Sequence, residues 1–195
     1  MNDAGACTYY SVDVEASGPV PGLYNLVSIG ATAIRPVGGR VLELGESFYA
    51  ELKPVFPGQD AAANKVHGLD PPRLAREGLE PAAAMARLTA FVERTIVPGS
   101  EAVFVGHVAV FDWMYISYYY AWSGQPNPFG YKGIDTKSLA MGLLGLPWPS
   151  TGKEFILERL GMAAQDAATV HRADADARHQ AEMFVALLRR AGLAE

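Results

Sequence analysis

Strand-like segments separated by turn residues open the chain, and they constrain its fold more than any other feature. Three segments rich in aromatic and β-branched residues are expected to be β-strands: residues 8–15, 26–34 and 47–52. Ser17-Gly18-Pro19 and Pro21-Gly22 separate the first strand from the second, and Gly38-Gly39 marks a turn before the third. The pattern predicts a meander of three strands.

Helices and strands alternate after the meander. Residues 60–76 are predicted to be loop with short helical pieces. Five helices are predicted: residues 81–95, 108–122, 137–144, 153–160 and 171–191. Two further strands are predicted: residues 102–106 and 134–136. This order predicts an α/β fold, a mixed five-stranded sheet with helices on both faces, in a single domain spanning residues 1–195.

Charge and composition exclude some classes of protein. The 195 residues carry a net charge of −5, which argues against a protein that coats long duplexes by neutralising phosphates. No apolar run reaches the roughly 20 residues that span a bilayer, and the N-terminus lacks the pattern of a secretory signal. The single cysteine, Cys7, cannot form an internal disulfide and fits a reducing, cytoplasmic location.

Two carboxylates stand at the end of the first predicted strand. Asp13 and Glu15 are two residues apart, so they share a face with Ser11, while Val12 and Val14 point to the other face and a core. Two acids side by side repel each other and resist desolvation, and a divalent cation such as Mg²⁺ would remove both costs. A solvated strand edge near a turn is the alternative explanation.

A third carboxylate, Asp112, lies on a predicted helix. Its neighbours on that helix face are Val108, Tyr115, Ile116 and Tyr119, so the acid sits on a mostly apolar stripe where an unpaired charge is costly. A functional role competes with three structural explanations: the helix dipole near the N-terminus, an unseen Arg or Lys, or a different helix phase.

The last motif pairs His171 with Asp176. Five residues correspond to about 140° around a helix, so the two share no helical face. They converge if His171 lies in the loop before the helix and Asp176 lies in its first turn.

Together these motifs resemble the DEDDh exonucleases, a family of ribonuclease H-like fold that includes proofreading exonuclease subunits, ribonuclease T and oligoribonuclease. The resemblance covers residues 8 to about 188, almost the whole chain. It rests on four motifs in order: Asp13-Val14-Glu15-Ala16-Ser17-Gly18, Val66-His67-Gly68-Leu69, Gly106-His107-x3-Phe111-Asp112 and His171-x4-Asp176. Each motif is weak alone, whereas their order and spacing form a strong signal.

The resemblance implies a metal-dependent 3′→5′ exonuclease that releases nucleoside 5′-monophosphates. Two Mg²⁺ or Mn²⁺ ions would be held by Asp13, Glu15 and Asp176, with Asp13 bridging. Asp112 would act directly or through metal-bound water. His171 would be the general base that takes the proton from the attacking water.

The resemblance also implies a site for the terminal nucleotide. The backbone at Ala16 and Ser17 would hold that nucleotide, and His67 and Phe111 would lie beside its base or sugar. Core packing is an equal alternative for Phe111. The partner would be nucleic acid with a free 3′ end, single-stranded or short by preference, and the choice between RNA and DNA stays open.

Two local features qualify this picture. Many members carry Asn directly after the histidine of the second motif, where this chain has Val108. For His107 itself, a structural hydrogen bond is favoured over catalysis. A cluster of aromatics on one helix (Trp113, Tyr118, Tyr119, Tyr120, Trp122) is interpreted mainly as core or as a homodimer interface, with base stacking as the alternative.

Three alternative functions accompany the exonuclease. One is a catalytically inactive module of the same fold that binds nucleic acid or a partner, although the presence of all five core residues argues against it. The second is a proofreading subunit that works within a polymerase complex. The third is a metal-dependent phosphohydrolase acting on small nucleotides, which the motif order disfavours.

Overall fold

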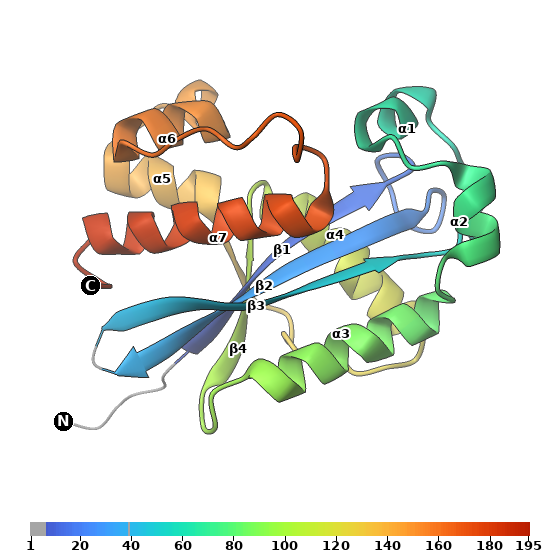
Figure 1. Ribbon diagram of the computed structural model, residues 1–195, viewed down its shortest axis with the longest axis horizontal. Coiled ribbons are helices and arrows are strands. Elements are labelled where there is room, and N and C mark those ends of the chain that lie inside the picture. The colour runs from blue at the N-terminus through green and yellow to red at the C-terminus, as the bar shows by residue number, and fades with distance from the viewer. Residues whose placement is uncertain (1–6, 39) are drawn as a thin grey trace.

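The computed structural model describes residues 7–38 and 40–195, whose strands form one mixed sheet (Figure 1). Its strands are β1 (Cys7–Ala16), β2 (Leu26–Gly38), β3 (Val41–Glu51), β4 (Glu101–Gly106) and β5 (Gly133–Asp135). The strand order is β3-β2-β1-β4-β5. The first three strands pair antiparallel, whereas β4 runs parallel to both β1 and β5. The predicted five-stranded mixed sheet is therefore confirmed.

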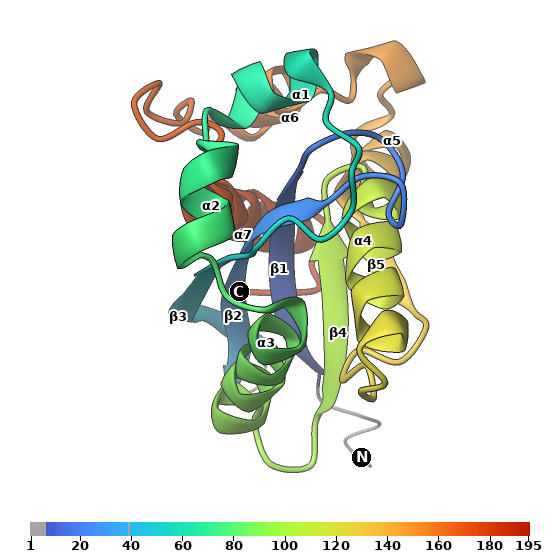
Figure 2. The same ribbon diagram turned by 90° about the vertical axis from the view of Figure 1, so that its right-hand side faces the viewer.

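Helices cover both faces of this sheet. They are α1 (Ala61–His67), α2 (Pro71–Glu77), α3 (Pro81–Thr95), α4 (Ala109–Trp122), α5 (Thr136–Leu144), α6 (Lys153–Leu160) and α7 (Ala173–Arg190), with a short 3-10 turn at Trp148–Ser150. Figures 1 and 2 show α7 on one face and α3 and α4 on the other, with α5 and α6 beside α7. Among the described residues, no helix is both long and apolar enough to cross a membrane.

The β2–β3 hairpin is longer than predicted. Pairing continues through Arg35 with Glu43 and Pro36 with Leu42 to Gly38 with Val41, in a region expected to be mostly turn. Leu42 explains the extension, because it is buried in a cluster with Ile34 and the C-terminal half of α7. Gly39 of the predicted turn lies outside the described residues.

Two short helices, α1 and α2, replace most of the predicted loop at residues 60–76. Aspartates cap both helices: the Asp60 carboxylate accepts from the backbone N–H of Ala62, and the Asp70 carboxylate accepts from that of Arg73. Each Asp stands directly before a helix as an N-cap, which is the sequence signal that was available there. The short helical pieces predicted in this loop are thus confirmed, as two capped helices of seven residues each.

Two other predicted boundaries shift for local reasons. The Asp135 carboxylate accepts from the Ser138 N–H, so α5 begins at Thr136 and β5 ends one residue earlier than predicted. His171 has φ 65°, which is not helical, so α7 begins at Ala173 and leaves His171 before the helix.

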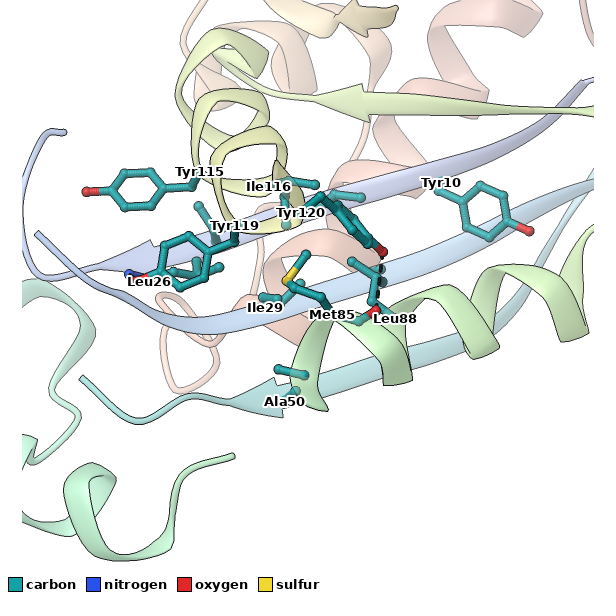
Figure 3. Packing of buried hydrophobic residues seen from close by; sticks show 14 of the residues in the cluster. Tyr10, Leu26, Ile29, Ala50, Met85, Leu88, Tyr115, Ile116, Tyr119 and Tyr120 are labelled. Carbon is teal, nitrogen blue, oxygen red and sulfur yellow. Dashed lines mark hydrogen bonds between the residues drawn. The ribbon is translucent and has the colours of Figure 1, made fainter. Parts of the chain in front are cut away.

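The main core lies between the sheet and the pair α3 and α4. Tyr10, Val12 and Val14 of β1 point into it, as their alternation predicted. The aromatic residues of α4 supply much of the rest: Tyr115, Tyr119 and Tyr120 are buried there (Figure 3). The interpretation of this aromatic cluster as mainly core is thus confirmed for Tyr119 and Tyr120, whereas Trp122 is 48% exposed.

Strand β1 extends past the end of its neighbour β4. The two strands pair only from Cys7 with Glu101 to Ser11 with Val105, although β1 continues to Ala16. Side chains from two helices take over the backbone groups left on this edge. The Val14 N–H donates to Asp112 Oδ1 of α4 at 3.0 Å, and the Val12 carbonyl accepts from Gln180 Nε2 of α7 at 3.2 Å. This edge is the place where the helices bring polar side chains into the sheet.

Val108, the N-cap residue directly before α4, has a strained backbone. It has φ 61° and ψ 47°, the left-handed region, which costs a residue with a Cβ about 1–2 kcal/mol and suits a β-branched side chain least. Asparagine tolerates this region because its short polar side chain forms local hydrogen bonds. The valine that this chain carries at position 108, where many family members carry Asn, is therefore a source of backbone strain.

Replacing Val108 with Asn should stabilise the protein by about 1 kcal/mol, because it relieves this strain. Urea unfolding in the presence of chelator measures the change. Val110→Asn is the matched control, since Val110 lies on α4 and is 75% exposed. An equal change in both variants would show that the backbone at Val108 stores no strain.

Candidate active site

A cavity of about 660 Å³ opens at the C-terminal end of β1. Figure 1 shows this end of the strand between α1 and the segment that joins α6 to α7. All five predicted core residues line the cavity: Asp13, Glu15, Asp112, His171 and Asp176. The location follows from topology, because pockets of open sheets form at the carboxyl ends of strands where the strand order changes direction.

Asp13 and Glu15 reach the cavity from the face of β1 that α7 covers. Their partners on β2 are small: Gly30 lies opposite Asp13 and Ser28 lies opposite Glu15. A Cβ at Gly30 would lie 1.9 Å from the carbonyl oxygen of Ala173, the first residue of α7. Gly30 therefore lets the start of α7 approach the sheet beside the two carboxylates.

Asp112 is held in place by the sheet edge. The side chain is 5% exposed in the first turn of α4, and its Oδ1 accepts from the Val14 N–H. Val14 lies between Asp13 and Glu15, so this hydrogen bond ties the third carboxylate to the first two. Of the explanations weighed for Asp112, the position near the helix N-terminus is confirmed, and a cation, Lys153, acts on it electrostatically.

His171 and Asp176 converge in the way the spacing required. Asp176 lies in the first turn of α7 and is 6% exposed. Its Oδ2 accepts from the backbone N–H of His171 at 2.8 Å, which fixes the loop that carries the imidazole. Glu15, His171 and Asp176 each offer a ligand atom, and these atoms lie within 4.8 Å of one another.

Burial raises the pKa of three of these carboxyl groups. Burial and the charges of Asp13 and Asp176 raise the pKa of Glu15 to about 8. Burial, in the first place, also raises the pKa of Asp13 and of Asp112, which repel each other. Acids that fold together at this cost fit a divalent cation, because a cation favours their charged forms and carboxylate oxygens are the ligands that Mg²⁺ and Mn²⁺ prefer.

His107 belongs to the scaffold of the cavity. Its Nδ1 lies 2.9 Å from the Thr136 hydroxyl, the structural hydrogen bond that the sequence favoured. Burial and the nearby lysines lower the pKa of His107 to about 4, so its ring is neutral at neutral pH. Asp135 adds a second brace, because its carboxylate accepts from the Ala109 N–H and so joins the start of α4 to β5.

The predicted nucleotide-binding residues divide into two pairs. Ala16 and Phe111 line a groove of about 360 Å³ that also contains Glu15 and borders α1. Phe111 lines the main cavity as well, with its ring 5.3 Å from that of Tyr115. The ring is half-buried, so it serves both as packing and as a wall of the site.

Ser17 and His67 lie outside this groove and the main cavity. Ser17 is fully buried, and its N–H donates to the Asn25 carbonyl while its hydroxyl donates to that of Gly58. His67 Nδ1 accepts from the Leu69 N–H, so Nε2 carries the proton toward Asn64 Oδ1 in the neutral ring. Both residues shape the loops around the groove, and their contact with a nucleotide stays a prediction.

Sequence reasoning missed two residues of the site. Gln180 lies one turn beyond Asp176 on the buried stripe of α7, and its Nε2 donates to Ser11 Oγ at 2.9 Å. The sequence signal that pointed to Gln180 was a polar residue on the otherwise apolar stripe of α7. Lys153 Nζ lies 4.0 Å from Asp176 Oδ1, and nothing in its sequence neighbourhood pointed to the cavity.

Comparison with known proteins gives this arrangement a family. The model of the 3′-5′ exoribonuclease Rv2179c-like domain matches residues 8–188. The chain belongs to this family. It is also 35% identical over 176 residues to the 3′-5′ DNA exonuclease Cap18 of Escherichia coli, covering 90% of this chain and 89% of Cap18. Membership supports 3′→5′ exonuclease activity on nucleic acid.

Solved structures confirm the fold. The nuclease domain of 3′hExo, a DEDDh family member bound to rAMP, matches with a TM-score of 0.79 at 14% identity, covering 97% of this chain and 95% of that one. The zinc-bound E. coli ExoI–ssDNA complex matches with a TM-score of 0.71 at 19% identity, covering 96% of this chain and 41% of ExoI. The ribonuclease H-like fold of the DEDDh exonucleases is therefore confirmed.

The raised carboxylate pKa values predict how stability depends on pH. In the unfolded chain these acids ionise near their ordinary pKa, whereas in the metal-free folded protein Glu15 ionises only near pH 8. The contribution of Glu15 to folding stability is thus fully present below about pH 4.5, and it is lost as the pH rises through 8. In chelator, the melting temperature should fall by about 3 °C or more between pH 6 and pH 8.5, and saturating Mg²⁺ should reduce that fall.

The double variant Asp13→Asn, Glu15→Gln is the control for this measurement. Its melting temperature in chelator should change less across the same pH range, because two of the acids with a raised pKa are gone. An unchanged slope would show that other groups cause the pH dependence.

Proposed function

We propose that this protein is a divalent-metal-dependent 3′→5′ exonuclease that removes nucleoside 5′-monophosphates from the 3′ ends of RNA or DNA. The observation that carries the proposal is the cavity lined by all five predicted core residues, in a member of a 3′-5′ exoribonuclease-like family. Asp13, Glu15, Asp112 and Asp176 would hold two Mg²⁺ or Mn²⁺ ions. When bound, such ions lower the pKa of an attacking water and stabilise charge on the leaving oxygen.

His171 is the general base in this proposal. Its imidazole would take the proton of the attacking water at a ring nitrogen. Two features of the loop support that role: the His171 N–H is bound to Asp176, and the residue is exposed next to the cavity. The hydrogen bond couples the position of the base to that of the carboxylate, so both would face the same phosphate.

The groove beside the cavity is the proposed site for the terminal nucleotide. Phe111 borders both spaces and would lie against the base or sugar, with the backbone at Ala16 beside it. Ser17 and His67 would contribute through the loops that they hold. A groove of about 360 Å³ next to a large open cavity favours single-stranded or short 3′ ends, which can enter without melting a duplex.

The relatives do not agree on whether the substrate is RNA or DNA. The family is described as exoribonuclease-like, Cap18 as a DNA exonuclease, 3′hExo was solved with rAMP, and ExoI was solved with single-stranded DNA. Oligonucleotides of RNA and DNA with 5′ labels, single- and double-stranded, should be incubated with Mg²⁺, Mn²⁺ or chelator. A descending ladder with metal establishes 3′→5′ polarity and the preferred sugar, whereas its absence under every condition contradicts the proposal.

An inactive binding module and a polymerase-associated proofreading subunit are the alternatives. Titration calorimetry with Mn²⁺ separates the first, because a decayed site binds no metal. Activity of the purified chain alone argues against the second. The proposal also includes a cytoplasmic location and a homodimer as an open possibility, for which light scattering gives the oligomeric state.

Asp13→Asn and Asp176→Asn should each lower the cleavage rate by about 100-fold or more, because even the outer partners of metal ligands typically contribute about 10–100-fold. Gel assays in saturating Mg²⁺ measure the rate, and circular dichroism checks that the variants are folded. Asp70→Asn is the matched control, since Asp70 caps α2 outside the cavity and Asn caps equally well. Full activity in either site variant would refute the assignment.

A further inference from the structure

Lys153 is the only Lys or Arg among the described residues that line the main cavity. It is the first residue of α6, and its side chain is 29% exposed. Its charge acts on Asp13, Glu15 and Asp112, lowering the pKa of each against the larger effect of burial. The ammonium therefore faces the same space as the carboxylates.

The position of Lys153 is fixed by packing. Ile156 and Leu157 of α6 are buried in a cluster with Met183 and Leu187 of α7. Helix α7 also carries Asp176, so the lysine and that carboxylate are attached to one rigid pair of helices. In the turn just before α6, the buried Thr151 hydroxyl donates to the Trp148 carbonyl.

The charges of the cavity show why a cation is needed there. Five carboxylates line it: Asp13, Glu15, Asp112, Glu154 and Asp176. Two divalent cations would compensate four of these charges and leave one, which would repel an incoming phosphodiester. His107 adds no charge at neutral pH, since its pKa is about 4. Lys153 supplies the missing positive charge.

We infer that Lys153 is a further catalytic residue, which contacts a non-bridging oxygen of the scissile phosphate. The inference rests on the proposed exonuclease function. During hydrolysis the water oxygen bonds to phosphorus and its proton passes to His171. The bond from phosphorus to the 3′ oxygen of the shortened strand breaks, that oxygen takes up a proton from solvent, and negative charge grows on the phosphate oxygens. Lys153 transfers no proton and forms no covalent bond, and its fixed charge stabilises that growing charge. In the structure the Lys153 ammonium lies 4.0 Å from Asp176 Oδ1, within the same carboxylate cluster.

Cleavage kinetics of a 5′-fluorescein oligonucleotide test the inference with matched variants. Lys153→Met, which removes the charge and keeps much of the length, should lower kcat by about 100-fold, the loss typical of one lost transition-state donor. Lys153→Gln should behave in the same way, and it replaces the first variant if that one does not fold. Lys153→Arg should retain activity within about 10-fold because it keeps the charge. Lys132→Met should match the wild type, since Lys132 pairs with Glu101 outside the cavity.

Binding supplies a readout that does not depend on turnover. In Mg²⁺, calorimetry compares the nucleoside 5′-monophosphate of the preferred sugar (AMP or dAMP) with the nucleoside that lacks the phosphate. Lys153→Met should lower the affinity for the monophosphate by about 10-fold and leave the affinity for the nucleoside unchanged. Mn²⁺ affinity should be unchanged or higher, because the variant removes a positive charge from a cation site.

Three outcomes overturn the inference. Wild-type kcat and monophosphate affinity in Lys153→Met would make the lysine a mere counter-ion of Asp176. Loss of Mn²⁺ binding together with activity would show that it acts through the integrity of the carboxylate cluster. A wild-type chain that cleaves no oligonucleotide would remove the proposed function and the inference together, whereas an active wild type with an equally active Lys153→Met removes the inference alone.

Discussion

The site depends on one hydrogen bond at the edge of the sheet, from the Val14 N–H to Asp112 Oδ1 at 3.0 Å. It exists because β1 continues past the last residue of β4 that pairs with it, which leaves backbone groups without a strand partner. A buried N–H without an acceptor is costly, so a helix side chain takes that place. The side chain that does so is a carboxylate, and it thereby lies beside the two acids on the opposite face of the same strand segment. The contact that satisfies the Val14 N–H therefore also places Asp112 at the proposed metal site.

The second constraint is the close approach of α7 to the sheet. Gly30 permits it, because any Cβ there would collide with the Ala173 carbonyl. Gln180 holds it, because its amide reaches Ser11 on β1 and the Val105 carbonyl on β4. With α7 fixed at both points, Asp176 joins the other carboxylates, and burial together with the neighbouring charges raises the pKa of Asp13, Glu15 and Asp112. The fold thus concentrates negative charge where a divalent cation and Lys153 can balance it, at a cost in stability for the metal-free protein at high pH.

Much of the fold and most of the candidate site could be predicted from local pattern. Strand periodicity placed Asp13 and Glu15 on one face, and helix counting placed Asp112 near a first turn. The predicted last helix included His171, although the spacing to Asp176 showed that the two meet only if His171 precedes the helix. Errors arose where tertiary packing decides a boundary. The hairpin extends because Leu42 packs against α7. The strain at Val108 was visible only as a departure from a motif, since a sequence does not display backbone angles.

The sequence by itself determined the order of the strands and helices, the family to which the chain belongs and the five side chains that carry the proposed chemistry. These follow from short-range spacing, which fixes the face and phase of each residue within its own strand or helix. Only the tertiary structure decided that Lys153 faces the carboxylates and that Gln180 bridges α7 to two strands. It also decided that the Ser17 hydroxyl donates to the carbonyl of Gly58, in a loop far along the chain. The reason is physical: contacts between segments far apart in the chain depend on how helices pack on the sheet, and local sequence patterns do not encode that geometry.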